Sequence, residues 1–280
     1  MITPRRSIAS GTFVQGDDHH YPEESPARRV SVGPFVLDVH PVTNAQFAEF
    51  VDATDHVTAA ERTGAAVFVP AAGPVDLGQP DLWWRHEPLA NWRRPLGTAP
   101  LEAEHADHPV VAVTHADAVA YAAWRGARLP TESEWEWAAA AGQPLPATWP
   151  LAEDGQLLAN VWLGEFPWRS IRNRPPGTMA VGAFPPNHNG LFDMLGNVWE
   201  LTADPWSRPA VGSPCCAPAA TTAADGVVAK GGSFLCAANY CRRYRPAARH
   251  RQAVDEPTCH IGFRCADDLG TTAADGGTNG

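Results

Sequence analysis

The sequence lacks the features that mark several classes of protein. It has a single lysine, Lys230, and a formal net charge of −10, which disfavours a surface that binds nucleic acid. No stretch stays apolar for long enough to span a membrane, and the N-terminal segment MITPRRSIASGTFVQG has no signal-peptide core. We therefore expect a cytoplasmic protein that binds neither nucleic acid nor a membrane.

Cysteine is scarce, whereas proline, glycine and tryptophan are plentiful. Six cysteines in 280 residues are too few for a disulfide scaffold, and cytoplasmic thiols stay reduced. The 27 prolines, 24 glycines and 11 tryptophans are scattered along the chain. Proline and glycine interrupt regular elements, and large aromatic side chains can hold loops that lack hydrogen-bond ladders. Since no linker divides the chain, these features predict one loop-rich domain.

Three helices are predicted from their N-terminal capping residues. Thr43 lies three residues before Gln46, and Thr131 lies three residues before Glu134, which is the capping-box spacing. A third helix is predicted to begin at Thr114. Apolar residues follow each start at helical spacing, so each helix has one face for the core.

Regular strands are expected to be few and short. Apolar and polar residues alternate over residues 29–39, and residues 227–230 form a second short strand candidate. Residues 67–107 and 151–189 are interrupted by proline and glycine throughout. Irregular segments of that length inside a compact domain usually carry function, so we expect binding loops there.

The strongest candidate for chemistry is the pair Cys236 and Cys241 in KGGSFLCAANYCRRYRPAARHR. Residues five apart point to opposite faces of a strand, and in a helix they lie about 140° apart. The two thiols can therefore meet only if the chain turns between them. The intervening segment AAN favours such a turn, because its side chains are small and asparagine tolerates left-handed geometry.

Three interpretations of the pair stay open at this point. The thiols can form a reactive or metal-binding pair, they can be two unrelated buried cysteines, or they can form a disulfide, which a reducing cytoplasm disfavours. Two thiolates without a nearby histidine or carboxylate make a soft site that selects Cu(I), whereas zinc would need four ligands. The arginines that follow would lower the thiol pKa values if they lie close to the pair.

Several motifs occur in an order typical of one known family. They are PARRVSVGPFVLDVHPVTNAQFAEFV, HPVVAVTHADAVAYAAWRGARLPTESEWEWAAA, ANVWLGEFP, AFPPNHNGLFDMLGNVWELTAD, KGGSFLCAANYCRRYRPAARH and GFRCADD. This order resembles the formylglycine-generating enzymes (the sulfatase-modifying factor family) from about Gly11 to Asp268. The frame GNVWE, GGSF and GFRCA marks the broad superfamily, whereas the added C-x4-C is typical of the aerobic, copper-dependent type.

The resemblance implies a fold and a domain division. The fold class would be α+β, a single domain of the formylglycine-generating-enzyme fold, which is related to C-type lectins and has little regular secondary structure. Residues 1–10 would be an N-terminal extension, residues 11–268 the sulfatase-modifying-factor domain, and residues 269–280 a disordered tail. We expect a monomer.

The resemblance also implies a reaction and its residues. Cys236 and Cys241 would hold Cu(I), and a cysteine in a C-x-P-x-R motif of a sulfatase or similar peptide would be converted with O2 to Cα-formylglycine. Ser233 resembles a catalytic serine near the oxygen site. The substrate-binding groups of the family correspond here to Trp199, Tyr240 and Arg249. Each has an alternative interpretation: Trp199 as a core residue, Tyr240 as a packing residue and Arg249 as an ion-pair partner.

Structural Ca2+ is the second implied cofactor. Its ligands in FDMLGNVWE would be the carboxylates of Asp193 and Glu200 and the backbone carbonyls of Gly196 and Val198. Such hard oxygen ligands suit Ca2+. A second Ca2+ would use Asn160 and Val161. The stretch WRSIRNRPPG that follows has no acid, and only Asn173 is available as a substitute ligand.

The chain departs from the family at positions that affect function. Ala237 and Asn239 stand where the family usually has histidine and serine, which leaves a different thiol substrate as a second hypothesis. A third hypothesis is a non-catalytic, lectin-like binding module, which the superfamily frame permits. Cys265 lacks its usual partner, and Cys259 is the candidate to replace it.

Overall fold

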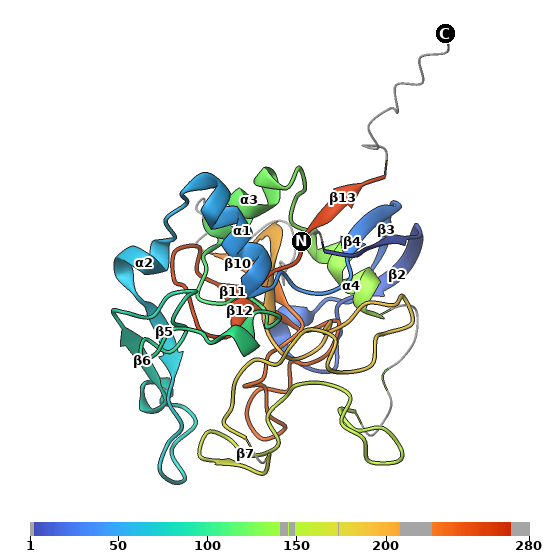
Figure 1. The fold of residues 1–280 in the computed structure, drawn as a ribbon. Coiled ribbons are helices and arrows are strands. Elements are labelled where there is room, and N and C mark those ends of the chain that lie inside the picture. The colour runs from blue at the N-terminus through green and yellow to red at the C-terminus, as the bar shows by residue number, and fades with distance from the viewer. Residues whose placement is uncertain (1–2, 141–144, 146–148, 173, 208–225, 270–280) are drawn as a thin grey trace, which may run out of the picture.

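Short sheets joined by long loops make up the fold (Figure 1). The structure is a computed structural model, and it describes residues 3–140, 145, 149–172, 174–207 and 226–269. No helix in these ranges is long and apolar enough to cross a membrane. Most of the expected tail, residues 270–280, lies outside the described residues.

Four α-helices in the described part of the chain begin at capping residues. They are α1 (Asn44–Thr54), α2 (Ala59–Thr63), α3 (His115–Trp124) and α4 (Glu132–Ala140). The three predicted helices are confirmed as α1, α3 and α4, and α1 has the predicted capping box. Thr131 and Glu134 also pair reciprocally, since the Thr131 Oγ1 accepts from the Glu134 N–H at 3.1 Å and the Glu134 carboxylate accepts from the Thr131 N–H at 2.8 Å. These pairs satisfy N–H groups that have no partner within the helix.

Two sheets in the described ranges have more than two strands. One is three-stranded, in the order β1 (Arg5–Ile8), β4 (Phe35–Asp38), β13 (Ala266–Asp268). The other is four-stranded, in the order β11 (Arg249–Gln252), β10 (Val227–Lys230), β9 (Trp199–Pro205), β12 (Ile261–Gly262). The strand predicted at residues 227–230 is confirmed as β10. Because β1 pairs with β4, residues 5–8 belong to this sheet although we expected them to precede the domain.

Three hairpins and three 3-10 turns surround these sheets. The hairpins are β2 (Gly11–Gln15) with β3 (Arg28–Val32), β5 (Ala65–Phe68) with β6 (Trp84–Glu87), and β7 (Gly164–Glu165) with β8 (Arg169–Ser170). The 3-10 turns are η1 (Pro22–Glu24), η2 (Pro80–Leu82) and η3 (Ala103–His105). The single strand predicted at residues 29–39 is in fact two, β3 and β4, because Gly33 and Pro34 separate them.

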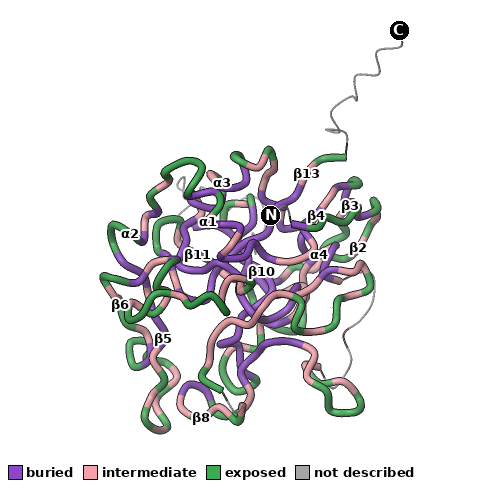
Figure 2. Tube along the Cα trace, in the orientation of Figure 1, coloured by how far each residue is buried: buried purple, intermediate pink, exposed green. Residues whose placement is uncertain are grey.

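The buried residues converge on the middle of the molecule, around β10 and β11 (Figure 2). The largest core cluster joins the inner faces of α1 and α3 to β9 and contains Phe47, Tyr121, Leu201 and Phe263. Cys236 belongs to the same cluster. The loop that carries the cysteine pair is therefore anchored directly in the core.

Candidate active site

The cysteine pair lies on the loop that leaves β10. Gly231 and Gly232 have positive φ angles of 96° and 75°, and a Cβ atom on Gly231 would come within 2.8 Å of the Met194 carbonyl oxygen. Only glycine fits so close an approach. The chain then turns, as predicted, and the Cys241 N–H donates to the Ala237 carbonyl at 3.0 Å. The two Sγ atoms lie 3.3 Å apart as free thiols.

The two thiols have different surroundings. Cys236 is 2% exposed, and burial raises its pKa well above the usual value, as does the neighbouring Cys241. The pKa of Cys241 is instead lowered to about 6, first by the hydrogen bond from Cys236 and then by the Arg243 guanidinium, which lies 3.8 Å from its Sγ. At neutral pH the pair therefore carries one thiolate and one thiol.

Arg243 is held in place from the N-terminal part of the chain. Its Nε donates to a Glu23 carboxylate oxygen at 3.0 Å, and its guanidinium lies 3.8 Å from the centre of the Tyr21 ring. Both residues come from η1 or the residue before it. The sequence pointed to the arginines in general, but it gave no means of selecting Arg243, because its two partners lie more than 200 positions away.

Replacing Arg243 with alanine should raise the pKa of Cys241 above 6, because one of the groups that stabilise the thiolate is lost. A lowered pKa keeps the thiolate present at neutral pH and loses it as the pH falls through that value. Alkylation of the copper-free protein by iodoacetamide across a pH series will measure this. The matched control is Arg242→Ala, which removes an exposed neighbour. An unchanged profile in the Arg243 variant would contradict the assignment.

A groove of about 360 Å³ opens beside the thiols. Ser233 lies at its base and is fully buried, and its Oγ accepts from the Leu235 N–H at 3.2 Å. Trp199 is part of the core cluster, as the packing interpretation expects, and it also lines the groove, so its substrate-binding role stays a prediction. The Tyr240 ring stacks on Phe166 with centroids 4.6 Å apart and remains 38% exposed, which leaves its other face for a ligand.

Residues from distant segments complete the groove, and sequence reasoning missed them. Trp84 comes from β6, His250 and Arg251 come from β11, and Glu256 and His260 come from the segment between β11 and β12. Burial lowers the pKa of His250 to about 4 and that of His260 to about 3, so both rings are uncharged at neutral pH. No local motif marks these residues, because only the tertiary fold gathers them.

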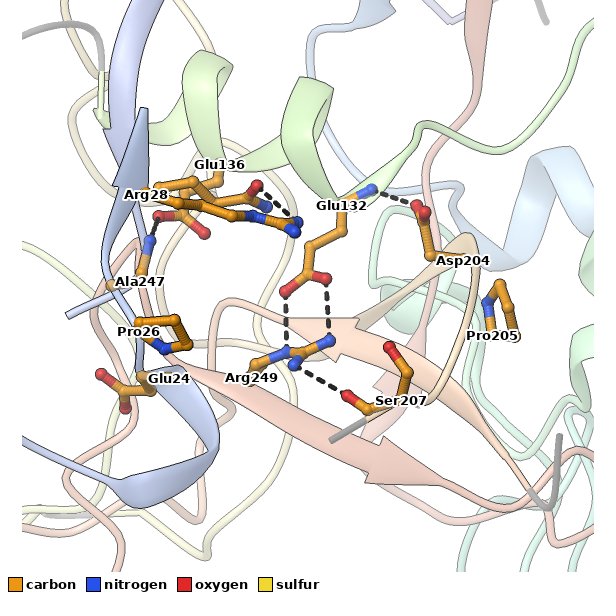
Figure 3. Close-up of a pocket in the computed structure, with 12 residues that line it drawn as sticks. Glu24, Pro26, Arg28, Glu132, Glu136, Asp204, Pro205, Ser207, Ala247 and Arg249 are labelled. Carbon is orange, nitrogen blue, oxygen red and sulfur yellow. Dashed lines mark hydrogen bonds and ion pairs between the residues drawn. The ribbon is translucent and has the colours of Figure 1, made fainter. Parts of the chain in front are cut away.

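Arg249 is not among the residues that line this groove. It lies in a second cavity of about 270 Å³, where its Nε and one NH group lie 2.9 Å from the Glu132 carboxylate at the start of α4 (Figure 3). Its remaining NH group donates to the carbonyl oxygens of Glu23 and Ser207. All its nitrogen groups thus face protein atoms, and the structure favours the ion-pair interpretation of this residue over the substrate-binding one.

Known proteins resemble this chain over almost its whole length. Residues 4–269 match the Sulfatase-modifying factor enzyme 1-like domain. The chain belongs to this family. It is 47% identical over 295 residues to the formylglycine-generating enzyme of Mycobacterium tuberculosis, covering 96% of this chain and 99% of that protein. Its identity to the formylglycine-generating enzyme of Thermomonospora curvata is 43%, over 94% of this chain and 92% of that protein.

Among solved structures, the chain resembles PvdO from Pseudomonas aeruginosa. The TM-score is 0.65 at 25% identity, covering 95% of this chain and 94% of that one. The predicted fold class, a single α+β domain of the sulfatase-modifying factor fold with little regular secondary structure, is therefore confirmed.

The two carboxylates of the family loop at residues 193–200 differ in their surroundings. Asp193 is buried, and burial raises its pKa to about 6, while the Gly182 N–H donates to it at 2.8 Å. Glu200 is fully buried, but Arg264 donates to both of its oxygens, at 2.6 and 2.7 Å. Asp193 therefore fits a Ca2+ ligand, whereas the charge of Glu200 is already balanced.

The second family cation position does not fit Ca2+ in this chain. The Oδ1 atom of Asn160, the oxygen that would face the ion, accepts a hydrogen bond from Arg172, whose other NH group lies 3.1 Å from the Met179 sulfur. Val161 is a buried core residue. Asn173, the possible substitute ligand, lies outside the described residues. A guanidinium thus holds the place that a second ion would need.

Replacing Arg172 with alanine should destabilise the fold by about 1–3 kcal/mol, because the buried Asn160 oxygen loses its partner. Urea unfolding of the native protein and of Arg172→Ala will measure the difference in the free energy of unfolding. Arg174→Ala removes an exposed arginine that bonds only to the Thr178 carbonyl among its described contacts, so it should cost less than about 0.5 kcal/mol. Equal losses in the two variants would contradict a special role for Arg172.

The two remaining described cysteines do not pair. Cys259 accepts a hydrogen bond from the Phe68 N–H at 3.3 Å, and Cys265 lies next to Asp38 in a different cluster. Both are free and buried. The candidate partnership of Cys259 with Cys265 is therefore wrong, because the core separates them.

Ala237 and Asn239, which differ from the usual family residues, both contribute to packing. Ala237 is completely buried and its segment forms a bridge with Trp162. The Asn239 Oδ1 accepts from the Phe166 N–H at 3.3 Å, which fixes the ring that stacks beneath Tyr240. Asn239 therefore helps to shape one wall of the groove.

Proposed function

We propose that this protein converts the cysteine of a C-x-P-x-R segment, in a sulfatase or a similar peptide, to Cα-formylglycine with Cu(I) and O2. The observation that carries the proposal is the pair of free thiols that lie 3.3 Å apart and line a groove. The identity to enzymes named for this reaction supports the conversion itself.

The donor set of the pair fits Cu(I). Cys236 and Cys241 offer two soft sulfur ligands, and one of them is already a thiolate at neutral pH. When bound, Cu(I) would supply the one-electron chemistry with O2 that thiols alone lack. The groove leaves room for a third thiolate, from the substrate, to reach the pair.

The chain's own residues would bind and orient the substrate. Tyr240 presents the free face of its ring to the entering peptide, and Phe166 holds that ring from behind. Ser233 is buried next to the pair, and its N–H donates to the Cys236 sulfur at 3.4 Å, which fixes that ligand. We further propose that Asp193 and the carbonyls of Gly196 and Val198 hold a structural Ca2+, with Glu200 sharing an oxygen with Arg264.

Mass spectrometry of a C-x-P-x-R peptide incubated with copper-loaded protein and O2 tests the proposal. The expected product has lost the thiol sulfur and gained an aldehyde that reacts with hydroxylamine. Omitting O2 or copper should abolish it. An unmodified peptide under all conditions would refute the proposed reaction on this substrate.

A different thiol substrate is the second candidate, and Ala237 is the observation that favours it. An apolar, fully buried alanine follows the first cysteine, where the family usually has a histidine. Tight Cu(I) binding without turnover of the C-x-P-x-R peptide would support this alternative.

A further inference from the structure

Within the described chain, the groove beside the thiols contains a single carboxylate, Glu256. The other ionisable lining groups are Arg243, Arg251, two uncharged histidines, Tyr240 and the two thiols. Arg243 already pairs with Glu23. Apart from the Cys241 thiolate, the negative charge of the groove therefore comes from Glu256.

The backbone that carries Glu256 is fixed, whereas its carboxylate is exposed. The Glu256 carbonyl accepts from the Gln252 side chain at 2.5 Å, and the carbonyl of the next residue, Pro257, accepts from the Ala66 N–H at 2.9 Å. The carboxylate makes no hydrogen bond or ion pair with the part of the chain that the structure describes. The fixed backbone keeps the carboxylate beside the groove, while the side chain stays free to turn toward a ligand at the cost of ordering its rotamers.

An aromatic ring accompanies this carboxylate in the groove. Trp84 is half-buried and lies against His260, with ring centroids 5.0 Å apart, and both line the same cavity as Glu256. A carboxylate together with an indole ring suits a guanidinium group, which pairs with the first and stacks on the second. A neutral side chain would gain no ion pair with the carboxylate, and an acidic side chain would be repelled by it.

We propose that Glu256 binds the arginine of the C-x-P-x-R substrate and thereby sets the specificity at that position. This inference rests on the proposed function. The arginine follows the cysteine by four residues, which is at most about 13 Å of extended chain at ~3.3 Å per residue. Glu256 lines the same groove as the thiol pair, so a peptide whose cysteine enters there would lay its following residues over a lining that includes Glu256.

The test is a binding cycle that does not depend on turnover. Fluorescently labelled S-x-P-x-R and S-x-P-x-Q peptides, in which serine replaces the reactive cysteine, are titrated with the native protein and with Glu256→Gln, and anisotropy is followed. The variant should bind the arginine peptide about tenfold more weakly, as expected for a lost charged hydrogen bond, and the glutamine peptide within about twofold of the native protein.

Asp255→Asn is the matched control, because it removes an adjacent exposed carboxylate that does not line the groove. It should change neither affinity beyond about twofold, the scatter expected of a surface substitution. An equal loss for both peptides, the same loss in Asp255→Asn, or no binding of either peptide would overturn the proposal. Selective binding without turnover of the cysteine peptide would leave this inference standing and refute the proposed reaction instead.

Discussion

Cys236→Ala and Cys241→Ala should each abolish Cu(I) binding and lower peptide turnover by more than ~100-fold, the loss that removal of even an outer-shell partner can cause. Each variant leaves one soft ligand, and the remaining thiol cannot hold the ion alone against competing thiols in solution. Titration with a Cu(I)-selective chromophoric chelator will measure affinity, and mass spectrometry will measure turnover.

Cys259→Ala provides the comparison for this experiment. Cys259 is as buried as Cys236, but it lies in a different cluster and its contact is with the Phe68 backbone. Its variant should keep Cu(I) binding even if it is less stable. Full activity in either Cys236→Ala or Cys241→Ala would refute the assignment of the pair.

Lys230→Ala should destabilise the fold by about 3–5 kcal/mol, the cost of leaving a buried charge without its partner. The Lys230 Nζ is completely buried and lies 2.7 Å from a Glu136 carboxylate oxygen and 3.6 Å from Glu132. Glu136 is 2% exposed, and without the ammonium its described partners would include the Gly16 N–H but no cation at hydrogen-bond distance. Chemical denaturation at neutral pH will measure the loss.

Two further variants make this prediction specific. Lys230→Met combined with Glu136→Gln removes both charges and should recover most of the stability, because a neutral pair needs no compensation. Arg169→Ala breaks an ion pair with Glu165 in which both side chains are more than half exposed, and it should cost about 0–1 kcal/mol. If the double variant is as unstable as Lys230→Ala, packing and not charge explains the effect.

The parts of the fold that local chemistry determines could be predicted from the sequence. Thr43, Thr114 and Thr131 mark helix starts because a capping bond involves residues only three apart. The spacing of Cys236 and Cys241 showed that they can meet only across a turn, and the resemblance to the family supplied the expectation that they do. The break between β3 and β4 was missed, because the apolar alternation continues across Gly33 and Pro34 although the chain changes sheet there.

The parts that depend on distant contacts could not be predicted in this way. Arg249 and Arg243 belong to one arginine-rich run, and only their partners, Glu132 and Glu23, decide which of them faces the thiols. Similarly, the lack of an acid after Asn160 argued against a second Ca2+, but it did not reveal that Arg172 takes its place.

The contact between η1 and Arg243 joins residues from the N-terminal and C-terminal parts of the chain. Glu23 and Arg243 are separated by 220 positions, and β1 and β13, from the two ends of the chain, both flank β4. A ribosome must therefore release almost the whole polypeptide before the thiol that Arg243 stabilises acquires its lowered pKa. A nascent or prematurely terminated chain that ends before residue 236 would carry Glu23 without its arginine and would lack both thiols of the pair.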